Sequence, residues 1–307
     1  YKKLSRETGQ CLLCPRECVI SEGKRGFCRN RENQGGTLYT IVYGKPSIVD
    51  IGPIEKAPLY HFIPGHFRLC LTCASCNLRC KHCQNWYLSQ SSSEDLNCLS
   101  YTPEEIVQQA KKRGLFSISF TYTEPTVYYE YLYDISMIAR ENGIKTSIVS
   151  NGYINQEPLL KLLTVLDAVK IDLKGFSEGF YKEVCSATLK PVLDSLLTVK
   201  KENVWLEIVN LVIPTLNDDT KMIDEMCRWI KENLGAETPL HFTRFLPNYK
   251  LMHLYPTAIS TLESAYEIAK QNGLRYVYIG NVPGHIYNST FCPFCNRKVI
   301  HRTNFDI

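Results

Sequence analysis

Three cysteines, Cys76, Cys80 and Cys83, fall within the eight residues CNLRCKHC. Thiols at two- and three-residue gaps are typical of metal sites. A closed structural zinc site needs four ligands. His82 could be the fourth, but it is adjacent to Cys83, so both could reach one tetrahedral ion only with strain. A disulfide framework would leave one thiol over. The third interpretation is an iron–sulfur cluster held by three thiolates, with one iron open to a non-protein ligand.

The elements that must position these cysteines follow a strand–helix rhythm that begins after residue 66. Successive strands after the first helix start roughly 25–40 residues apart, the length of a βα unit with its crossover. This pattern predicts an α/β fold with a parallel sheet that closes toward a barrel. The predicted strands are Arg68–Thr72, Phe116–Tyr122, Lys145–Val149, Ala168–Leu173, Trp205–Ile213, Leu240–Phe245 and Arg275–Gly280, with Leu38–Tyr43 as an earlier strand.

Helix boundaries are marked by capping residues. Thr102-Pro103-Glu104-Glu105 combines an N-cap, a proline at the first helical position and a capping-box glutamate. Asp218–Leu234 and Thr257–Asn272 are amphipathic stretches that predict two further helices. Helix ends are predicted at Asn142-Gly143 and Asn272-Gly273.

Polar residues cluster where the predicted strands end, which is where sites form in such sheets. Asn210 and Arg244 also point toward the predicted cavity, Arg244 by the period-two alternation of a strand. This convergence is stronger evidence than any one motif. The strand-end residues are Cys76–Cys83, Thr123-Glu124-Pro125, Ser150-Asn151-Gly152, Asp172-Leu173-Lys174-Gly175, Pro214 to Asp219 and Arg244 to Tyr249.

Further cysteines lie near both termini. Four thiols before the predicted barrel are spaced so that they could supply all the ligands of one metal site, either zinc or an auxiliary iron–sulfur cluster: Cys11, Cys14, Cys18 and Cys28. Alternatively, Cys11 and Cys14 could meet the Cys292-x2-Cys295 knuckle as a structural zinc site. Both assignments of these cysteines to a metal site stay open. Cys70 and Cys73 are expected to be buried small hydrophobes, and Cys98, Cys185 and Cys227 to be inert.

Composition limits the protein's class. Of the 307 residues, 44% are apolar and 21% charged, so a substantial core can form without disulfides. The net charge is only +4 and the basic residues are scattered, which argues against a nucleic-acid partner. No apolar run is long enough to span a bilayer, and no signal-peptide core is visible at the start. We therefore expect a cytoplasmic protein with metal-bound thiolates.

Several stretches between Cys11 and Arg302 resemble those of the AmmeMemoRadiSam-system radical SAM enzymes, relatives of the pyruvate formate-lyase activating enzymes. The resemblance implies a partial (β/α)6 radical SAM barrel (67–256) with a Cys-rich N-terminal extension (1–66) and a C-terminal extension (257–307). The stretches are CLLCPRECVI, GKRGFC, PIEKAPLYHFIPG, CNLRCKHCQNW, FTYTEPTVYYEYLYDI, VSNGYI, AVKIDLKGF, LVIPTLNDD, HFTRFLPNYKL, RYVYIGNVPGH and CPFC.

The resemblance also implies roles for the strand-end residues. A four-iron four-sulfur cluster on Cys76, Cys80 and Cys83 would chelate the amino and carboxylate groups of S-adenosylmethionine through its open iron. By the same resemblance, His82 would lie near the adenosine and Glu124 would bind the cofactor's ammonium. Ser150-Asn151-Gly152 corresponds to the turn written T-N-G in the activating enzymes. Asp172 and Lys174 correspond to a D-L-K element, in which Lys174 would pair with the cofactor's carboxylate. Asn210 is a further candidate cofactor contact. A capping role for Glu124 beside Pro125 and a surface position for Lys174 are the alternatives.

This chain departs from the family's pattern in two places. Cys70, Cys73 and Ser75 stand where relatives carry Ser, Thr and Gly, which leaves open an extra metal contact or a different loop path. Val149 precedes the Ser150 turn where the activating enzymes have an Asp that helps bind a monovalent cation, which puts that cation site in doubt.

Two functions follow from the resemblance. The first is an oxidoreductase or transferase whose 5′-deoxyadenosyl radical takes hydrogen from a small molecule, lipid or peptide. The second is an activase that removes a hydrogen from a glycine of a partner protein. Both need a one-electron reductant such as ferredoxin or flavodoxin. The terminal extensions favour the first, because they would narrow the mouth. A non-catalytic zinc module does not explain the strand-end residues.

Overall fold

The structure is a computed structural model that describes all residues, Tyr1 to Ile307. The chain divides into two compact units. The first unit contains residues 1–52, 67–79 and 83–169. The second contains residues 53–66, 80–82 and 170–307.

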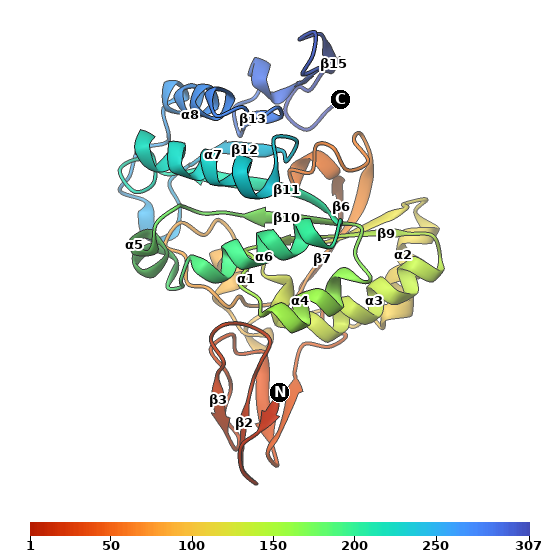
Figure 1. Cartoon of the computed structure of the whole chain (residues 1–307). Helices are drawn as coiled ribbons and strands as arrows, with labels where there is room; N and C mark the ends of the chain where they lie inside the picture. The colour runs from red at the N-terminus through yellow and green to blue at the C-terminus, as the bar shows by residue number, and fades with distance from the viewer. The chain divides into compact units, whose positions relative to one another are not determined.

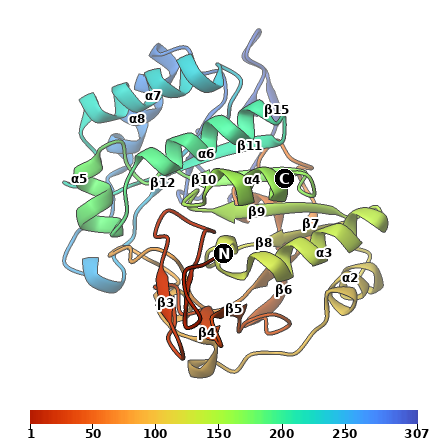
Figure 2. The same ribbon diagram turned by 60° about the horizontal axis from the view of Figure 1, so that its bottom comes forward.

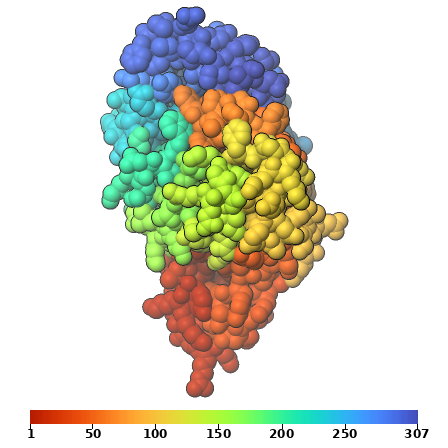
Figure 3. Space-filling view, turned by 90° about the vertical axis from the view of Figure 1, so that its right-hand side faces the viewer, coloured from red at the N-terminus to blue at the C-terminus, as the bar shows by residue number.

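Short antiparallel strands form the N-terminal part of the first unit, in red and orange in Figure 1; Figure 3 draws the same residues as red and orange spheres. One sheet has the order β1-β2-β3, and β4 pairs with β5 in a hairpin. Gly35 and Gly36 turn this hairpin with φ of 63° and 75°, the left-handed conformation that a two-residue hairpin loop needs. The strands are β1 Lys2–Lys3, β2 Thr8–Gln10, β3 Val19–Ser21, β4 Arg31–Gln34 and β5 Thr37–Thr40.

The main sheet strands of the first unit have the order β9-β8-β7-β6, and β7, β8 and β9 are parallel. All four residues of β8 are buried, as expected for a parallel strand covered on both faces. Helix α3 packs against β9 and α2 (Figure 2). The strands are β6 Ile48–Pro53, β7 Phe67–Thr72, β8 Ser117–Phe120 and β9 Lys145–Ser150; the helices are α1 Trp86–Ser89, η2 Ser93–Asp95, α2 Pro103–Lys112, η3 Pro125–Tyr128, α3 Tyr129–Glu141 and α4 Gln156–Leu163.

The second unit continues the β–α alternation. Its strands have the order β13-β12-β11-β10, with β11, β12 and β13 parallel. The strands are β10 Ala168–Asp172, whose first two residues belong to the first unit, β11 Trp205–Val212, β12 Leu240–Arg244, β13 Val277–Gly280, β14 Thr290–Phe291 and β15 Lys298–Ile300. The helices are η1 Ile54–Lys56, α5 Glu178–Phe180, η4 Tyr181–Cys185, α6 Lys190–Lys201, α7 Thr220–Leu234, η5 Tyr249–Leu251, α8 Ile259–Gln271 and η6 Ile286–Asn288.

A buried polar network lies in the core of the second unit. The Glu207 carboxylate accepts hydrogen bonds from the backbone N–H groups of Tyr60 (2.9 Å) and His61 (2.8 Å) and contacts His241 Nε2 at 2.8 Å. Although burial disfavours its charged form, the bonds from His241 and His61 lower the pKa of Glu207 to about 2. The network ties the segment after η1 to β11 and β12.

The α/β prediction and all seven predicted strands of the alternation are confirmed, with strand ends within two residues of those expected. The earlier strand Leu38–Tyr43 is wrong in its second half. It ends at Thr40, because Lys45 N–H bonds Val42 C=O at 3.0 Å and Gly44, with φ of 70°, turns the chain.

The predicted helix boundaries are largely confirmed. Thr102 and Glu105 form the reciprocal capping box of α2, with Glu105 accepting from Thr102 N–H at 2.8 Å. Helix α8 begins at Ile259 rather than Thr257, because the Thr257 hydroxyl donates to Val212 C=O at 2.6 Å and so holds its residue outside the helix. Helices α3 and α8 end at the expected Asn-Gly pairs. No helix is both long enough and apolar enough to cross a membrane.

Candidate functional site

The cysteine loop that follows β7 is tied down at its start, in the first unit. Ser75 has φ of 78°, a left-handed conformation that favours glycine. Two hydrogen bonds hold it there: its N–H donates to Leu88 C=O at 2.9 Å, and its hydroxyl donates to Cys28 C=O at 2.5 Å. The Asn77 side chain adds a bond to Tyr153 C=O at 2.7 Å. These contacts fix the backbone that presents Cys76.

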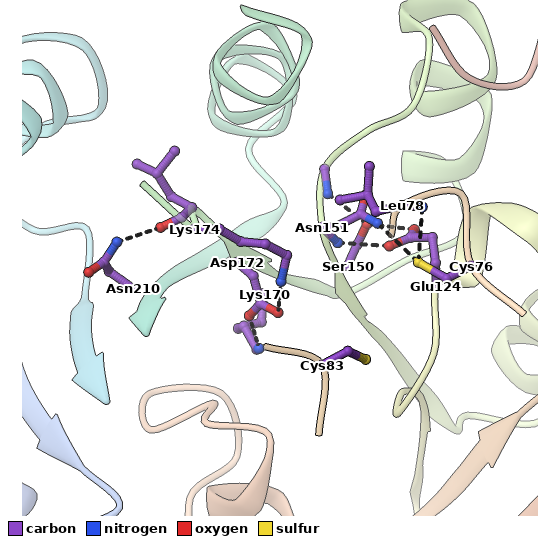
Figure 4. A network of polar contacts seen from close by, with 12 residues as sticks. Cys76, Leu78, Cys83, Glu124, Ser150, Asn151, Lys170, Asp172, Lys174 and Asn210 are labelled. Carbon is purple, nitrogen blue, oxygen red and sulfur yellow. Dashed lines mark hydrogen bonds and ion pairs between the residues drawn. The ribbon is translucent and has the colours of Figure 1, made fainter. Parts of the chain in front are cut away.

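Polar groups lie close to the sulfurs of Cys76 and Cys83, the two motif cysteines of the first unit. Cys76 Sγ accepts from Leu78 N–H at 3.3 Å and from the Asn151 side-chain amide at 3.6 Å (Figure 4). Cys83 Sγ lies 3.2 Å from the Ser89 hydroxyl. The two N–H donors stabilise negative charge on Cys76 Sγ, so they favour the thiolate that a metal needs.

Cys80 and His82 belong to the second unit. The Cys80 thiol hydrogen-bonds the thiol of Cys185, and this bond together with burial raises the Cys80 pKa well above its ordinary value. Lys81 N–H holds the segment on η4 through Val184 C=O at 2.9 Å. Cys185, which was expected to be inert, therefore contacts one of the motif thiols.

His82 is held neutral in an apolar setting. Its side chain is buried and stacks on the ring of Phe180, with 6.4 Å between the ring centroids. Burial, with the Lys174 charge nearby, lowers the pKa of His82 to about 3. Its Nδ1 has no hydrogen-bond partner. The imidazole is thus a buried, uncharged ring whose Nδ1 has an open acceptor or donor position.

Glu124 joins the loops after β8 and β9. Its Oε1 accepts from the Thr126 N–H (3.1 Å), the Thr126 hydroxyl (2.8 Å) and the Ser150 hydroxyl (2.8 Å). Its Oε2 accepts from the Asn151 N–H at 2.8 Å. Burial raises the pKa of this carboxyl, although the four donors oppose the rise. The side chain caps η3, as in the alternative interpretation, and Oε2 keeps an acceptor position.

The turn that contains Ser150, Asn151 and Gly152 lies next to the cysteine loop. The Asn151 side-chain amide donates to Asn77 Oδ1 at 2.9 Å as well as toward the Cys76 sulfur. Gly152 has φ of 69° and donates its N–H to the Ser150 hydroxyl at 3.0 Å. The predicted strand-end residues of β7, β8 and β9 therefore meet in one network, shown in Figure 4.

A charged group marks the end of β10 in the second unit. Asp172 contacts the ammonium groups of both Lys170 and Lys174, the latter at 3.1 Å. Although burial disfavours the charged form of Lys174, Asp172 raises its pKa well above the ordinary value, so the ammonium stays charged. Asn210 donates to Leu173 C=O at 2.7 Å, and its Oδ1 has no partner. Arg244 instead donates through Nε to Thr257 C=O at 2.9 Å.

The remaining cysteines separate by unit. Cys11, Cys14, Cys18 and Cys28 belong to the first unit, and Cys292 and Cys295 interact with each other in the second. Cys70 and Cys73 are fully buried, as expected of small hydrophobic residues. All fourteen cysteines are thiols. No three His, Cys, Asp or Glu side chains are gathered round one ion position.

Sequence reasoning missed three residues of these networks. Lys170 stands two residues before Asp172, so the period-two pattern of a strand could have placed it on the same face. Asn77 and Cys185 carried no such signal, because their contacts depend on which loops the fold brings together. The chemistry of the residues nevertheless fits a thiolate-bound cluster: the motif supplies three thiols, and the Cys76 sulfur accepts two N–H hydrogen bonds.

Comparisons with known proteins agree with this chemistry. The family model described as the Radical SAM superfamily matches residues 71–230. An uncharacterized protein of Methanocaldococcus jannaschii is 50% identical over 306 residues, which cover 100% of this chain and 91% of that protein. A pyruvate formate-lyase-activating enzyme of Clostridium pasteurianum is 28% identical over 173 residues, covering 53% and 68% of the two chains. The solved structure of Streptococcus suis SuiB bound to S-adenosylmethionine shares the fold, with a TM-score of 0.53 at 16% identity, covering 72% and 52%.

Proposed function

Because the chain belongs to the Radical SAM superfamily, an enzyme family that uses a [4Fe-4S] cluster and S-adenosylmethionine, we propose that Cys76, Cys80 and Cys83 hold that cluster. Cluster and S-adenosylmethionine together supply a 5′-deoxyadenosyl radical, which takes hydrogen from a substrate C–H bond. The observation that carries this assignment is the Asn151 side chain, which bonds both Asn77 and the Cys76 sulfur while its N–H bonds Glu124.

In the first unit, the protein's task is to stabilise the thiolate form of the motif cysteines and to hold the loops in place. Leu78 N–H and the Asn151 amide stabilise the Cys76 thiolate, and the Ser89 hydroxyl, 3.2 Å from Cys83 Sγ, would donate to that sulfur once it is a thiolate. Ser150 and Asn151 hold the buried Glu124 carboxylate, whose Oε2 would accept one bond from the cofactor's ammonium. A site fixed by such bonds needs little reorganisation when the cofactor binds.

In the second unit, the proposed cofactor contacts are His82, Asp172, Lys174, Asn210 and the ligand Cys80. Asp172 keeps the Lys174 ammonium charged, and a charged ammonium can pair with the carboxylate of S-adenosylmethionine. The neutral, buried His82 ring offers a stacking surface for the adenosine. Asn210 Oδ1, which lacks a partner, offers an acceptor. Gly152 completes the proposed set in the first unit.

The enzyme needs a reductant and a substrate. We propose ferredoxin or flavodoxin as the one-electron donor and a small molecule, lipid or peptide as the substrate, with no nucleic acid. Thiol-rich chemistry of this kind fits a cytoplasmic location. We also propose that the chain has three parts: the N-terminal extension 1–66, the barrel 67–256 and the C-terminal extension 257–307. The alternative is an activase for a glycine of a partner protein, which the similarity to an activating enzyme favours.

The test is anaerobic reconstitution with iron and sulfide, followed by reduction with S-adenosylmethionine. The expected product is 5′-deoxyadenosine, absent in Cys76→Ala and retained in the matched control Cys98→Ser, which lies outside the motif. No product above the Cys76→Ala background would refute the proposal. Deuterium transfer from a labelled small substrate to 5′-deoxyadenosine without a protein partner would exclude the activase alternative.

A further inference from the structure

Four cysteines of the first unit lie together beside the N-terminal strands. Cys11 follows β2 and Cys18 precedes β3, and Cys11 N–H donates to Cys18 C=O at 2.9 Å. Burial, with Cys28 and Cys11 close by, raises the pKa of Cys14 to about 12. Burial also raises the pKa of Cys28, which interacts with Cys11 and Cys18. Cys11 and Cys28 are therefore each within electrostatic range of the other three sulfurs.

Each of these four sulfurs accepts a backbone N–H bond. Three of the donors stand two residues after the cysteine that they bond, as Leu78 does for Cys76 in the radical SAM motif. Such bonds orient thiolates and offset their charge when a metal binds. The four donor–sulfur pairs are Leu13 to Cys11, Arg16 to Cys14, Asn30 to Cys28, and Phe27 to Cys18 at 3.4 Å.

A buried cation stands beside the same sulfurs. Arg31 interacts with Cys11 and Cys28, is 5% exposed, and pairs through one terminal nitrogen with Glu130 at 2.5 Å. Its Nε has no hydrogen-bond partner. An unpartnered buried N–H costs free energy unless something accepts it. A metal centre with four thiolates would carry net negative charge and would supply that acceptor.

The four cysteines share a neighbour with the radical SAM motif. The Asn77 side-chain amide hydrogen-bonds the Cys14 sulfur, and the same side chain accepts from Asn151 at 2.9 Å. Asn77 follows Cys76 directly. Because Ser75 also donates to Cys28 C=O, two of the four cysteines, Cys14 and Cys28, contact the loop that presents the first motif cysteine.

We propose that Cys11, Cys14, Cys18 and Cys28 bind a second metal centre through four thiolates, filled by a thiophilic metal: zinc, or the iron of an iron–sulfur cluster. No three of these side chains surround one ion position in this structure, so metal binding at this site requires the thiols to reorient. The site is distinct from the proposed radical cluster and does not depend on it. The Cys292–Cys295 knuckle is no part of it.

The test uses the full chain with Cys76, Cys80 and Cys83 all changed to alanine, so that the radical cluster cannot contribute metal. Zinc, iron and acid-labile sulfide are measured after anaerobic purification. One metal centre per chain is expected; iron with sulfide identifies a cluster, and zinc without sulfide identifies a mononuclear site. Adding Cys14→Ser and Cys18→Ser should abolish it, whereas adding Cys98→Ser or Cys295→Ser should leave it intact. Metal absent from the triple variant, or lost with Cys295→Ser, would overturn the proposal.

A second measurement covers variants that fail to fold. The unmutated protein is alkylated before and after chelation, and modified cysteines are mapped by mass spectrometry. Cys11, Cys14, Cys18 and Cys28 should react together, only after the chelator removes the metal, while the exposed Cys295 reacts in both samples. Equal alkylation of the four residues with and without chelator would refute the second centre even if radical activity is intact.

Discussion

Replacing Glu124 by glutamine tests the network that joins the strand ends of the first unit. The carboxylate takes four bonds, three at Oε1 and one at Oε2, all from protein donors. A glutamine of the same shape has one acceptor oxygen and one amide NH2. If the glutamine oxygen stays with the three donors at the Oε1 position, its NH2 group faces the Asn151 N–H, and two donors then meet without an acceptor. In the reverse orientation, three donors lose their acceptor.

The expected loss of stability is worked out for the first orientation, in which the glutamine oxygen keeps its three donors. One bond to a charged acceptor is lost at Asn151, worth about 1.5–3 kcal/mol. The other three bonds become neutral and weaken. Removal of a buried charge returns part of that loss, because burial opposes ionisation of this carboxyl. We therefore expect Glu124→Gln to lower the free energy of unfolding by about 2–3 kcal/mol.

The measurement is urea unfolding of the apoprotein, followed by circular dichroism, with Thr126→Val as the matched control. That variant removes one neutral hydroxyl donor and should cost about 1 kcal/mol. If Glu124→Gln matches the wild type within about 0.5 kcal/mol, the carboxylate does not hold the two loops and the reasoning fails. Because the apoprotein is used, this result is independent of the cofactor.

Three further outcomes are expected. The pKa of Glu207 is about 2 in the folded protein against an ordinary 4.5, so its ionisation contributes about 3 kcal/mol to the free energy of unfolding. This contribution is complete above pH 4.5 and is lost as the pH falls toward 2. Acid unfolding of Glu207→Gln should lack this dependence on pH. His82, with its pKa lowered from 6.5 to about 3, makes the fold less stable as pH falls below 6.5, by about 2 kcal/mol at pH 5, and equilibrium unfolding of His82→Phe should show a flatter profile there. Asp172→Asn leaves Lys170 and Lys174 without their carboxylate and should cost about 2 kcal/mol in urea unfolding, less than a fully buried pair because the Asp172 side chain is 30% exposed; no change would show that the triad is not stabilising.

The sequence predicted those parts of the structure that depend on local chemistry. The capping box at Thr102 and the Asn-Gly helix ends are decided by neighbouring residues, so they could be identified without the fold. The start of α8 could not, because Thr257 is held outside the helix by Val212, which lies in β11. Strand ends were predicted for the same reason as caps: the run of buried residues stops where polar residues begin.

The sequence nominated residues for the candidate site, but it did not predict the contacts between them. Glu124 and Asn151 follow different strands, and parallel pairing of β7, β8 and β9 makes their loops adjacent. Which atoms then meet depends on the path of each loop. The cap that Glu124 forms on η3 and the bond between Cys80 and Cys185 both arise from such paths, and neither spacing nor composition predicts them.

Ser75 shows why the N-terminal cysteines and the motif loop should be considered together. A non-glycine residue with φ of 78° is strained, so it persists only where other contacts compensate. One compensating bond runs from its hydroxyl to Cys28 C=O, and Cys28 is a proposed ligand of the second centre. Glycine at this position would relieve the strain but could not make that bond. The serine therefore couples the backbone before Cys76 to the backbone at Cys28, and metal bound at the N-terminal cysteines would stabilise the loop that presents the radical SAM motif.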